Sequence, residues 1–265
     1  MKRRKFGGAQ VPILGQGTWK MHGKEAVETL RAGLDLGLTH IDTAEMYGTE
    51  ETVAQAIEGR RDAVFLVSKV LPSNASRRGT VKACEQSLER LRTDRLDCYL
   101  LHWPGSHPLE DTIAAFEELR EAGKIRSYGV SNFDQDLLAE AARIAGRGKI
   151  ACNQVLYNLA ERHVEAKVLP RCRELGIALV GYSPFDDLPE GGELQAVARE
   201  LEATPRQVAL AFLTRLPDTF AIPKASKVAH VRENAGAAAL QLGERQISRL
   251  ERAYPLHVRR ELPTS

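Results

Sequence analysis

Thr39-His-Ile-Asp-Thr-Ala-Glu-Met-Tyr-Gly48 is the stretch that decides the fold, when it is read together with Phe65-Leu-Val-Ser-Lys69 and Tyr99-Leu-Leu-His-Trp-Pro104. Each stretch contains a short β-like run that ends on a polar residue, and these residues are Asp42, Lys69 and His102. Polar side chains at the ends of several different strands are typical of a barrel, whose active site gathers at the carboxyl ends of all its strands. An open sheet instead concentrates its chemistry at one switch point.

Eight β-like runs alternate with longer amphipathic segments along the chain. The runs cover residues 15–19, 39–43, 64–70, 96–102, 127–131, 150–155, 178–182 and 219–223. The helical segments cover residues 25–36, 50–57, 79–91, 109–122, 135–144, 164–175, 194–216 and 228–239. This rhythm requires parallel strands with the helices outside them. The sequence therefore predicts a single α/β domain over residues 1–265, folded as a (β/α)8 TIM barrel.

Two additions to a regular barrel are expected. Residues 5–8 and 11–14 indicate a small N-terminal β-hairpin around a glycine-containing turn. The segment 194–216 contains Pro205 directly after Thr204, a pair that suits a helix N-cap and first turn, so we expect two helices there. Gly15-Gln-Gly17 lacks the third glycine of a dinucleotide-binding fingerprint, and Trp19 stands where a helix would begin, which disfavours that interpretation.

Composition excludes several kinds of partner. The chain has 37 Lys and Arg against 35 Asp and Glu, and this net charge of +2 gives no reason to expect nucleic acid or a membrane. The basic start is followed by Gly7-Gly-Ala-Gln10 instead of the apolar region of a signal peptide. The cysteines Cys84, Cys98, Cys152 and Cys172 lie far apart, without disulfide or zinc-ligand spacing. We therefore expect a cytoplasmic monomer with reduced thiols and no metal.

The polar strand ends suggest a site for carbonyl reduction. The hydroxyl of Tyr47 could give a proton to a carbonyl oxygen if its pKa falls from about 10 toward neutrality, which needs a nearby cation and little water. Lys69 is the candidate cation, Asp42 would keep it charged, and His102 is a plausible contact to the same oxygen. The alternative is that Asp42 and Lys69 form a structural ion pair and His102 satisfies a core hydrogen bond.

These residues, together with Gly129-Val-Ser-Asn-Phe133, Tyr182-Ser-Pro184 and Ile222-Pro-Lys224, resemble the aldo-keto reductase superfamily, in its bacterial type with a short C-terminal tail. The resemblance runs from about Phe6 to the tail. It implies that Tyr47 is the general acid, that Lys69 and Asp42 tune it, and that His102 orients the carbonyl. Some double-bond reductases of the superfamily carry Glu where this chain has His102, so C=O reduction is expected.

A nicotinamide cofactor is expected because no side chain can supply a hydride. The resemblance assigns Ser131, Asn132 and Gln154 to the nicotinamide amide and Tyr182 to stacking on its ring. It assigns the segment around Lys224 to the adenosine 2′-phosphate and the adenine, at the kind of strand end and helix start that binds anions in barrels. The full set of expected cofactor residues is Thr18, Trp19, Ser131, Asn132, Gln154, Tyr182, Ser183, Pro184, Lys224, Ala225, Ser226, Lys227, His230, Glu233 and Asn234.

The chain departs from the pattern of the superfamily at the cofactor. Phe185-Asp-Asp187 follows Tyr182-Ser-Pro184 where many relatives have a small or basic loop, so either the acids point outward or the loop covers the cofactor differently. His230 stands where many relatives place Arg, and Ala225 where they place Ser. An imidazole is mostly neutral above a pKa of about 6.5, whereas a guanidinium is always charged and grips phosphate with two donors. We therefore predict an NADPH preference that is modest, that grows as the pH falls, and that tolerates NADH.

The substrate side of the site is predicted to be apolar. Trp19, Met46 and Trp103 neighbour the polar strand ends and are expected to line the pocket with His102, although such side chains could equally be core. The tail after Tyr254 is short, which favours a shallow pocket for small aldehydes or ketones. Two other functions remain open: a Schiff-base aldolase using Lys69 or Lys224, and a non-catalytic nicotinamide sensor on a partner protein.

Overall fold

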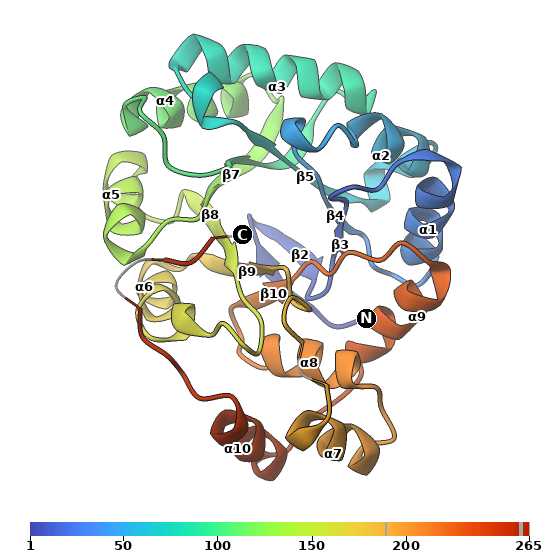
Figure 1. Cartoon of the computed structure of the whole chain (residues 1–265). Helices are drawn as coiled ribbons and strands as arrows, with labels where there is room; N and C mark the ends of the chain where they lie inside the picture. Colours follow the sequence, from blue (N-terminus) through green and yellow to red (C-terminus); the bar gives the residue numbers. More distant parts are fainter. Residues whose placement is uncertain (189, 260–261, 265) are drawn as a thin grey trace.

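The protein folds as the predicted barrel. The computed structural model describes residues 1–188, 190–259 and 262–264. One parallel sheet contains eight strands whose spatial order follows the chain, and Figure 1 shows them around a central axis with the helices outside. The strands are β3 (Gln16–Gly17), β4 (His40–Asp42), β5 (Phe65–Val70), β6 (Leu96–Leu101), β7 (Ile125–Ser131), β8 (Ile150–Leu156), β9 (Ala178–Tyr182) and β10 (Thr219–Ala221).

The ring closes between the first and last of these strands. Single bridges join Leu14 to Ala221 and Gly17 to Lys224. A Cβ atom on Gly17 would lie 2.7 Å from the carbonyl oxygen of Ile222, so this close approach requires a glycine. Gly17 therefore serves barrel closure, in agreement with the rejection of a dinucleotide fingerprint.

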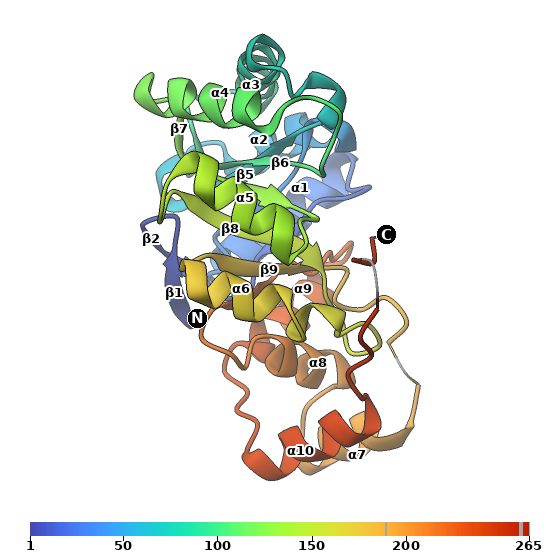
Figure 2. The same cartoon turned by 90° about the vertical axis from the view of Figure 1, so that its left-hand side faces the viewer.

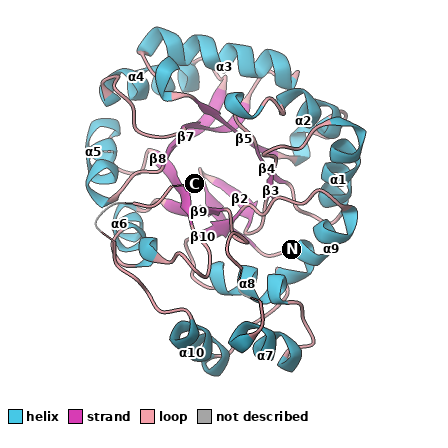
Figure 3. Cartoon of the chain, in the orientation of Figure 1, coloured by secondary structure: helices cyan, strands magenta, loops and turns pink. Residues whose placement is uncertain are grey.

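Helices surround the sheet, as the cyan ribbons of Figure 3 show. They are α1 (Gly23–Asp35), α2 (Glu50–Ile57), α3 (Arg77–Leu91), α4 (Leu109–Glu121), α5 (Gln135–Ala145), α6 (Val168–Leu175), α7 (Gly192–Glu200), α8 (Pro205–Leu213), α9 (Val228–Ala237) and α10 (Glu244–Ala253). Short 3-10 turns are η1 (Glu45–Tyr47), η2 (Arg61–Ala63), η3 (Pro72–Asn74) and η4 (His163–Glu165). Across the described part of the chain, no helix is long and apolar enough to cross a membrane.

The predicted helices are confirmed with two corrections. The segment 194–216 is indeed two helices, and Thr204 and Gln207 form a capping box at the start of α8. The helix expected from residue 164 begins at Val168, because residues 163–165 form the separate turn η4. Helix α10 was not predicted. Leu250 is its single fully buried residue, with Ile247 and Tyr254 packed partly against the core, and Arg249 ties it to Glu193 and Glu200 of α7.

The N-terminal hairpin is present, with its strands shifted from the predicted positions. It consists of β1 (Arg3–Phe6) and β2 (Ala9–Pro12), because Gly7 and Gly8 form the turn with φ values of 54° and 83°. The hairpin lies at the end of the barrel opposite to the C-terminus (Figure 2). The Phe6 ring packs inside that end, 4.9 Å from the Phe65 ring and 5.3 Å from the Phe220 ring.

A buried histidine beneath this aromatic cluster makes stability depend on pH. His40 is fully buried, and neither of its ring nitrogens has a hydrogen-bond partner among the described residues. Burial lowers its pKa from 6.5 to about 4. The unfolded chain therefore binds more protons than the folded one between these two values, so stability falls as the pH drops from about 6.5 to 4. A shift of this size corresponds to about 3 kcal/mol at the acid end.

We expect His40→Leu to remove the part of the stability loss at low pH that comes from protonating His40. Urea unfolding at a series of pH values should give a flatter dependence for His40→Leu than for the unmodified protein, with little loss of stability at pH 8. His257→Gln, which removes an exposed histidine, is the matched control and should keep the original slope. An unchanged slope in His40→Leu would show that the cost of charging His40 in the core is negligible.

Candidate active site

Three strand ends and one turn bring the predicted polar residues together. Asp42 ends β4, Lys69 lies near the end of β5, and His102 directly follows β6. The Lys69 ammonium is fully buried and lies 2.5 Å from Asp42 Oδ1, 2.8 Å from the carbonyl oxygen of Thr43 and 3.4 Å from the Tyr47 hydroxyl. Turn η1 therefore places the phenol directly over a buried cation.

The Tyr47 hydroxyl also faces an imidazole. His102 Nε2 lies 3.5 Å from it, and the two rings meet edge to face with centroids 5.5 Å apart. Burial and the nearby Lys69 lower the pKa of His102 from 6.5 to about 3, so this ring is neutral at physiological pH. A neutral imidazole can donate one hydrogen bond through one of its nitrogens. Two nitrogen groups thus converge on one hydroxyl oxygen.

The expected lowering of the Tyr47 pKa is wrong for this structure. Burial raises the pKa of Tyr47 above 10, and the neighbouring Lys69 opposes that rise without reversing it. The phenol consequently keeps its proton at neutral pH. A general acid has to be protonated before it acts, so the arrangement still suits proton donation, with Lys69 positioned to stabilise the oxygen anion that donation would leave.

Lys69 stays charged in spite of its burial. Burial alone would lower the pKa of Lys69, but Asp42 and the hydroxyl of Tyr47 outweigh it, and the net pKa is raised. The other carboxylate oxygen of Asp42 accepts a hydrogen bond of 2.7 Å from Gln154 Nε2. Asp42 is thus held between an ammonium and an amide. The contact to Thr43 and the bond from Gln154 were not foreseen, because they depend on how groups from different strands meet inside the barrel.

The residues expected at the nicotinamide amide form a connected set at the ends of β7, β8 and β9. Ser131 Oγ donates to the carbonyl oxygen of Gln154 (2.8 Å), and Asn132 Nδ2 donates to the carbonyl oxygen of His102 (3.0 Å). The Tyr182 hydroxyl donates to Asn132 Oδ1 (2.8 Å). Asn132 adopts a left-handed backbone conformation with φ of 61°, which is uncommon outside glycine and typical of functional turns. These bonds hold Asn132 against the His102 loop.

Exposed apolar side chains surround the phenol and the imidazole. The Trp19 ring lies 4.9 Å from the Tyr47 ring, and the Trp103 ring lies 4.8 Å from the His102 ring. Trp19, Met46 and Trp103 are 45%, 41% and 36% exposed, so they are not core residues. Large apolar groups left open beside a polar centre mark a ligand-binding surface.

The segment expected to bind the phosphate follows β10. Lys224, Ser226 and Lys227 are exposed, and Lys227 is the N-cap of α9. The backbone N–H groups of such a terminus and two ammonium groups favour an anion. His230 and Glu233 are half-buried on the first turns of α9, while Ala225 is buried.

Six of the expected cofactor residues have little or no exposed side chain, namely Thr18, Ser131, Gln154, Pro184, Ala225 and Asn234. Thr18 is fully buried and its hydroxyl donates to the carbonyl oxygen of Asp42 (3.0 Å), so it fixes a strand end. Pro184 is also buried. Asn234 is 2% exposed, and its Oδ1 has no hydrogen-bond partner among the described residues. An unpaired buried amide oxygen is unusual in a native structure and is suited to a donor arriving from outside the chain.

The acidic loop after β9 adopts the first of the two arrangements expected for it, with its carboxylates in solvent. Asp186 and Asp187 are exposed, while Phe185 packs against an apolar cluster that includes Ala225 and Val231. The Arg206 guanidinium lies 4.6 Å from the centre of the Phe185 ring and keeps a positive charge beside the loop. Ser183, also in this loop, accepts a bond from Asn158 through its carbonyl oxygen. In the described residues, no set of three acidic, histidine or cysteine side chains gathers as a metal site.

A parallel barrel with a Tyr, Lys, Asp and His set at the carboxyl ends of its strands defines a class of nicotinamide-dependent reductases, and comparison with known proteins agrees. The model of the Aldo/keto reductase family matches residues 6–255, and the chain belongs to this family. Methylglyoxal reductase YeaE of Escherichia coli (strain K12) is 43% identical over 264 residues, covering 94% of this chain and 93% of that protein. Glyoxal reductase of Bacillus subtilis (strain 168) is 34% identical, covering 92% and 89%.

A solved structure supports the same conclusion. An aldo-keto reductase from Klebsiella pneumoniae, crystallised in complex with NADPH, superposes with a TM-score of 0.94 at 43% identity, covering 100% of this chain and 99% of that one. The predicted family and fold are therefore confirmed. The protein is an aldo-keto reductase.

Proposed function

We propose that the protein reduces small aldehydes and ketones, of the methylglyoxal and glyoxal type, to alcohols with NADPH. The observation that carries this proposal is the Tyr47 hydroxyl, held 3.4 Å from the charged Lys69 and 3.5 Å from the neutral His102. Relatives named for the reduction of methylglyoxal and glyoxal support the substrate class. The open apolar surface of Trp19, Met46 and Trp103 suits a small carbonyl compound.

In the proposed reaction, the side chains of this site handle the proton. The cofactor, when bound, supplies a hydride to the carbonyl carbon. Tyr47 donates its proton to the carbonyl oxygen, which becomes the alcohol hydroxyl, and the phenolate left behind is stabilised by the Lys69 ammonium. The neutral ring of His102 orients the carbonyl oxygen toward Tyr47. Asp42 keeps Lys69 charged and in position, and solvent later returns the proton to Tyr47.

The residues present fit the cofactor at both of its ends. At the nicotinamide end, Asn132 is held in place by Tyr182 and the His102 loop, beside Ser131 and Gln154. At the adenosine end, Lys224 and Lys227 offer charge, and the unpaired Oδ1 of Asn234 offers an acceptor. We infer that these residues would hold NADPH across the mouth of the barrel.

Intrinsic fluorescence tests this proposal directly. The chain contains two tryptophans, Trp19 and Trp103, and both flank the proposed site. Titration with NADPH should quench their emission saturably, and a panel of small aldehydes should then produce NADPH oxidation at 340 nm. Saturable binding without turnover of any aldehyde would support a nicotinamide-sensing protein instead. Absence of both signals would contradict the proposal.

The structure gives no support to the aldolase alternative. A Schiff-base lysine must be unprotonated to attack a carbonyl, but the raised pKa of Lys69 keeps it charged. Lys224 is exposed and lies in the proposed phosphate segment. If borohydride trapped a keto substrate on the protein in the absence of nicotinamide, the aldolase function would be supported instead.

We predict that cofactor choice depends on the α9 segment. His230→Arg should raise the ratio of kcat/KM for NADPH over NADH, because a guanidinium grips phosphate with two donors. Lys224→Ala should lower the same ratio. The measurement is kcat/KM for both cofactors with one aldehyde at two pH values, and Lys24→Ala on α1 is the control. If the unmodified protein preferred NADPH over NADH by more than about 10⁴-fold in kcat/KM, some 5.5 kcal/mol, another cation would have to hold the phosphate.

We further propose that the protein acts as a monomer. We also propose that it works in a reducing compartment. The four cysteines are buried free thiols, and burial raises the pKa of Cys84 and Cys172 to about 12, which makes them unreactive. Size-exclusion chromatography with light scattering should give the mass of one chain.

A further inference from the structure

A charged groove lies at the end of the barrel that carries the hairpin. It lies between the hairpin turn and the segments that lead into β7, β8, β9 and β10, and its volume is about 570 Å³. Its apolar floor is made of Phe6, Ile150, Ala151, Ile177 and Ala178. The lining residues lie at the amino-terminal ends of these strands, whereas Asp42, Lys69 and His102 lie at or near the carboxyl ends of β4, β5 and β6, so this groove is separate from the proposed catalytic site.

The wall of the groove is strongly basic. The cations Lys5, Arg120, Arg126, Lys149 and Arg173 line it, whereas Asp218 is the one acidic residue that does. The whole chain has 37 basic against 35 acidic residues. A ratio of five to one in a nearly neutral protein is therefore a local concentration of positive charge, and such a concentration in a concave surface attracts anions.

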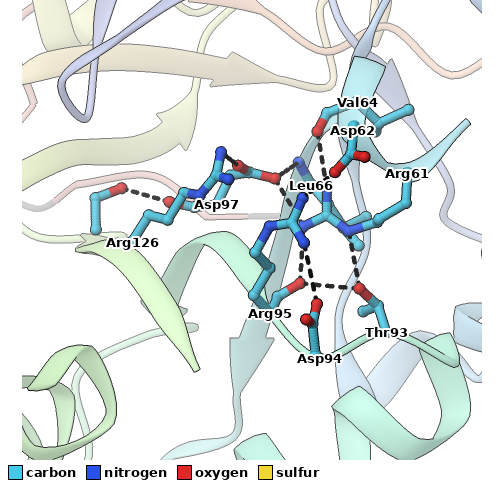
Figure 4. Close-up of polar contacts among 10 residues, drawn as sticks. Arg61, Asp62, Val64, Leu66, Thr93, Asp94, Arg95, Asp97 and Arg126 are labelled. Carbon is cyan, nitrogen blue, oxygen red and sulfur yellow. Dashed lines mark hydrogen bonds and ion pairs between the residues drawn. The ribbon is translucent and has the colours of Figure 1, made fainter. Parts of the chain in front are cut away.

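The carboxylates that pair with the lining cations do not neutralise the positive charge of the groove. Figure 4 shows Asp97 beside Arg126, to which it is bonded at 3.0 Å, and the same carboxylate also accepts a bond of 2.8 Å from Arg61. Two neighbouring cations therefore share one acid. This carboxylate is already engaged on both of its oxygens.

A second acid is shared in the same way. Glu117 bonds Arg120 (2.6 Å), Lys149 (2.9 Å) and the Tyr128 hydroxyl. These partners lower the pKa of Glu117 to about 2 against the effect of its burial.

The last two lining cations are Arg173 and Lys5. Arg173 pairs with Asp218 at 3.1 Å, and Lys5 has no ion-pair partner among the described residues. The five lining cations and Arg61, which shares Asp97, are thus matched by only the three carboxylates Asp97, Glu117 and Asp218. Since every one of these acids is already bonded, the excess charge is available to a ligand.

We propose that this groove binds a small, multiply charged anion that carries phosphate. Guanidinium groups such as Arg120, Arg126 and Arg173 present paired donors that match phosphate oxygens. The volume is that of a small-molecule site. Open space surrounds the rim at Gly8, Gly148 and Gly176, where an added Cβ would contact nothing within 4 Å. The near-neutral charge of the rest of the chain disfavours a long polyanion such as nucleic acid.

Inorganic pyrophosphate is the probe for this site. Calorimetric titration at constant ionic strength measures its affinity, and amide NMR shifts show where it binds. The test variant is Arg126→Gln with Lys149→Gln. Both substitutions spare the fold, because Asp97 keeps Arg61 and Glu117 keeps Arg120 and Tyr128. Arg171→Gln is the matched control, since Arg171 lies on α6 beside Arg173 but pairs with Glu174 outside the groove.

The expected result is saturable binding that the double variant weakens by about tenfold or more, equivalent to 1.4 kcal/mol, and that Arg171→Gln leaves unchanged. Amides around Gly8 and Gly148 should shift. Because Lys224 and Lys227 offer a second anion site, Lys224→Ala is included and should not weaken binding at the groove. Non-saturable shifts, equal affinity in the double variant, or loss of binding in Lys224→Ala alone would each overturn the proposal.

Discussion

Tyr47→Phe should abolish most carbonyl reduction while leaving NADPH affinity nearly unchanged. The hydroxyl lies between Lys69 and His102, and in the proposed reaction it acts only when charge develops on the carbonyl oxygen. General acid catalysis is typically worth about 10²–10⁴-fold, so kcat should fall by that factor. Steady-state kinetics with methylglyoxal and a fluorescence titration with NADPH measure the two effects separately.

A tyrosine outside the site provides the control for this experiment. Tyr254 lies just after α10 and is partly exposed, so Tyr254→Phe should keep full activity. Retention of more than half of kcat by Tyr47→Phe would remove Tyr47 from the mechanism. His102, or a water molecule that it orients, would then be the proton donor to examine.

Lys69→Met should cost both activity and stability. The substitution leaves the carboxylate of Asp42, which is 1% exposed, with the Gln154 amide but without its cation. Removing one partner of a buried ion pair typically costs about 3–5 kcal/mol. Urea unfolding followed by circular dichroism should show a loss of this order, and kcat should fall with it because the phenolate of Tyr47 loses its stabilising charge.

A double variant separates the buried charge from other effects of the substitution. Lys69→Met combined with Asp42→Asn removes the unpaired charge, so stability should recover partly while activity stays low. Lys24→Met, on the exposed first turn of α1, is the control for loss of a lysine and should change neither property. A fully stable and active Lys69→Met protein would show that the pair with Asp42 is dispensable.

The barrel and the position of its polar strand ends were predictable because they depend on local signals. Apolar runs that end on Asp42, Lys69 and His102 mark strands whose carboxyl ends must meet once the strands are parallel and consecutive. The structure brings these residues and Tyr47 within hydrogen-bonding range. Their catalytic roles remain a prediction.

Features that depend on register or on long-range packing could not be predicted. The bond from Gln154 to Asp42 joins residues far apart in the chain, on strands that are not neighbours in the sheet. Helix α10 packs through Leu250 and is bonded through Arg249 to Glu193 and Glu200, both in α7. The pKa of Tyr47 also rises with burial, which a single sequence does not reveal. Each of these features depends on how helices and strands that are distant in the sequence lie relative to one another.

The closing contact between the ends of the ring has a consequence for biosynthesis. Leu14 meets Ala221, and Phe6 meets Phe220, so these early segments can complete their packing only after the much later β10 has been synthesised. During that interval β3 presents an open strand edge, and Phe6 lacks part of its packing, both of which favour aggregation. Nascent chains that stop before β10 should therefore depend on chaperones, because the open edge of β3 is covered only once β10 has been synthesised.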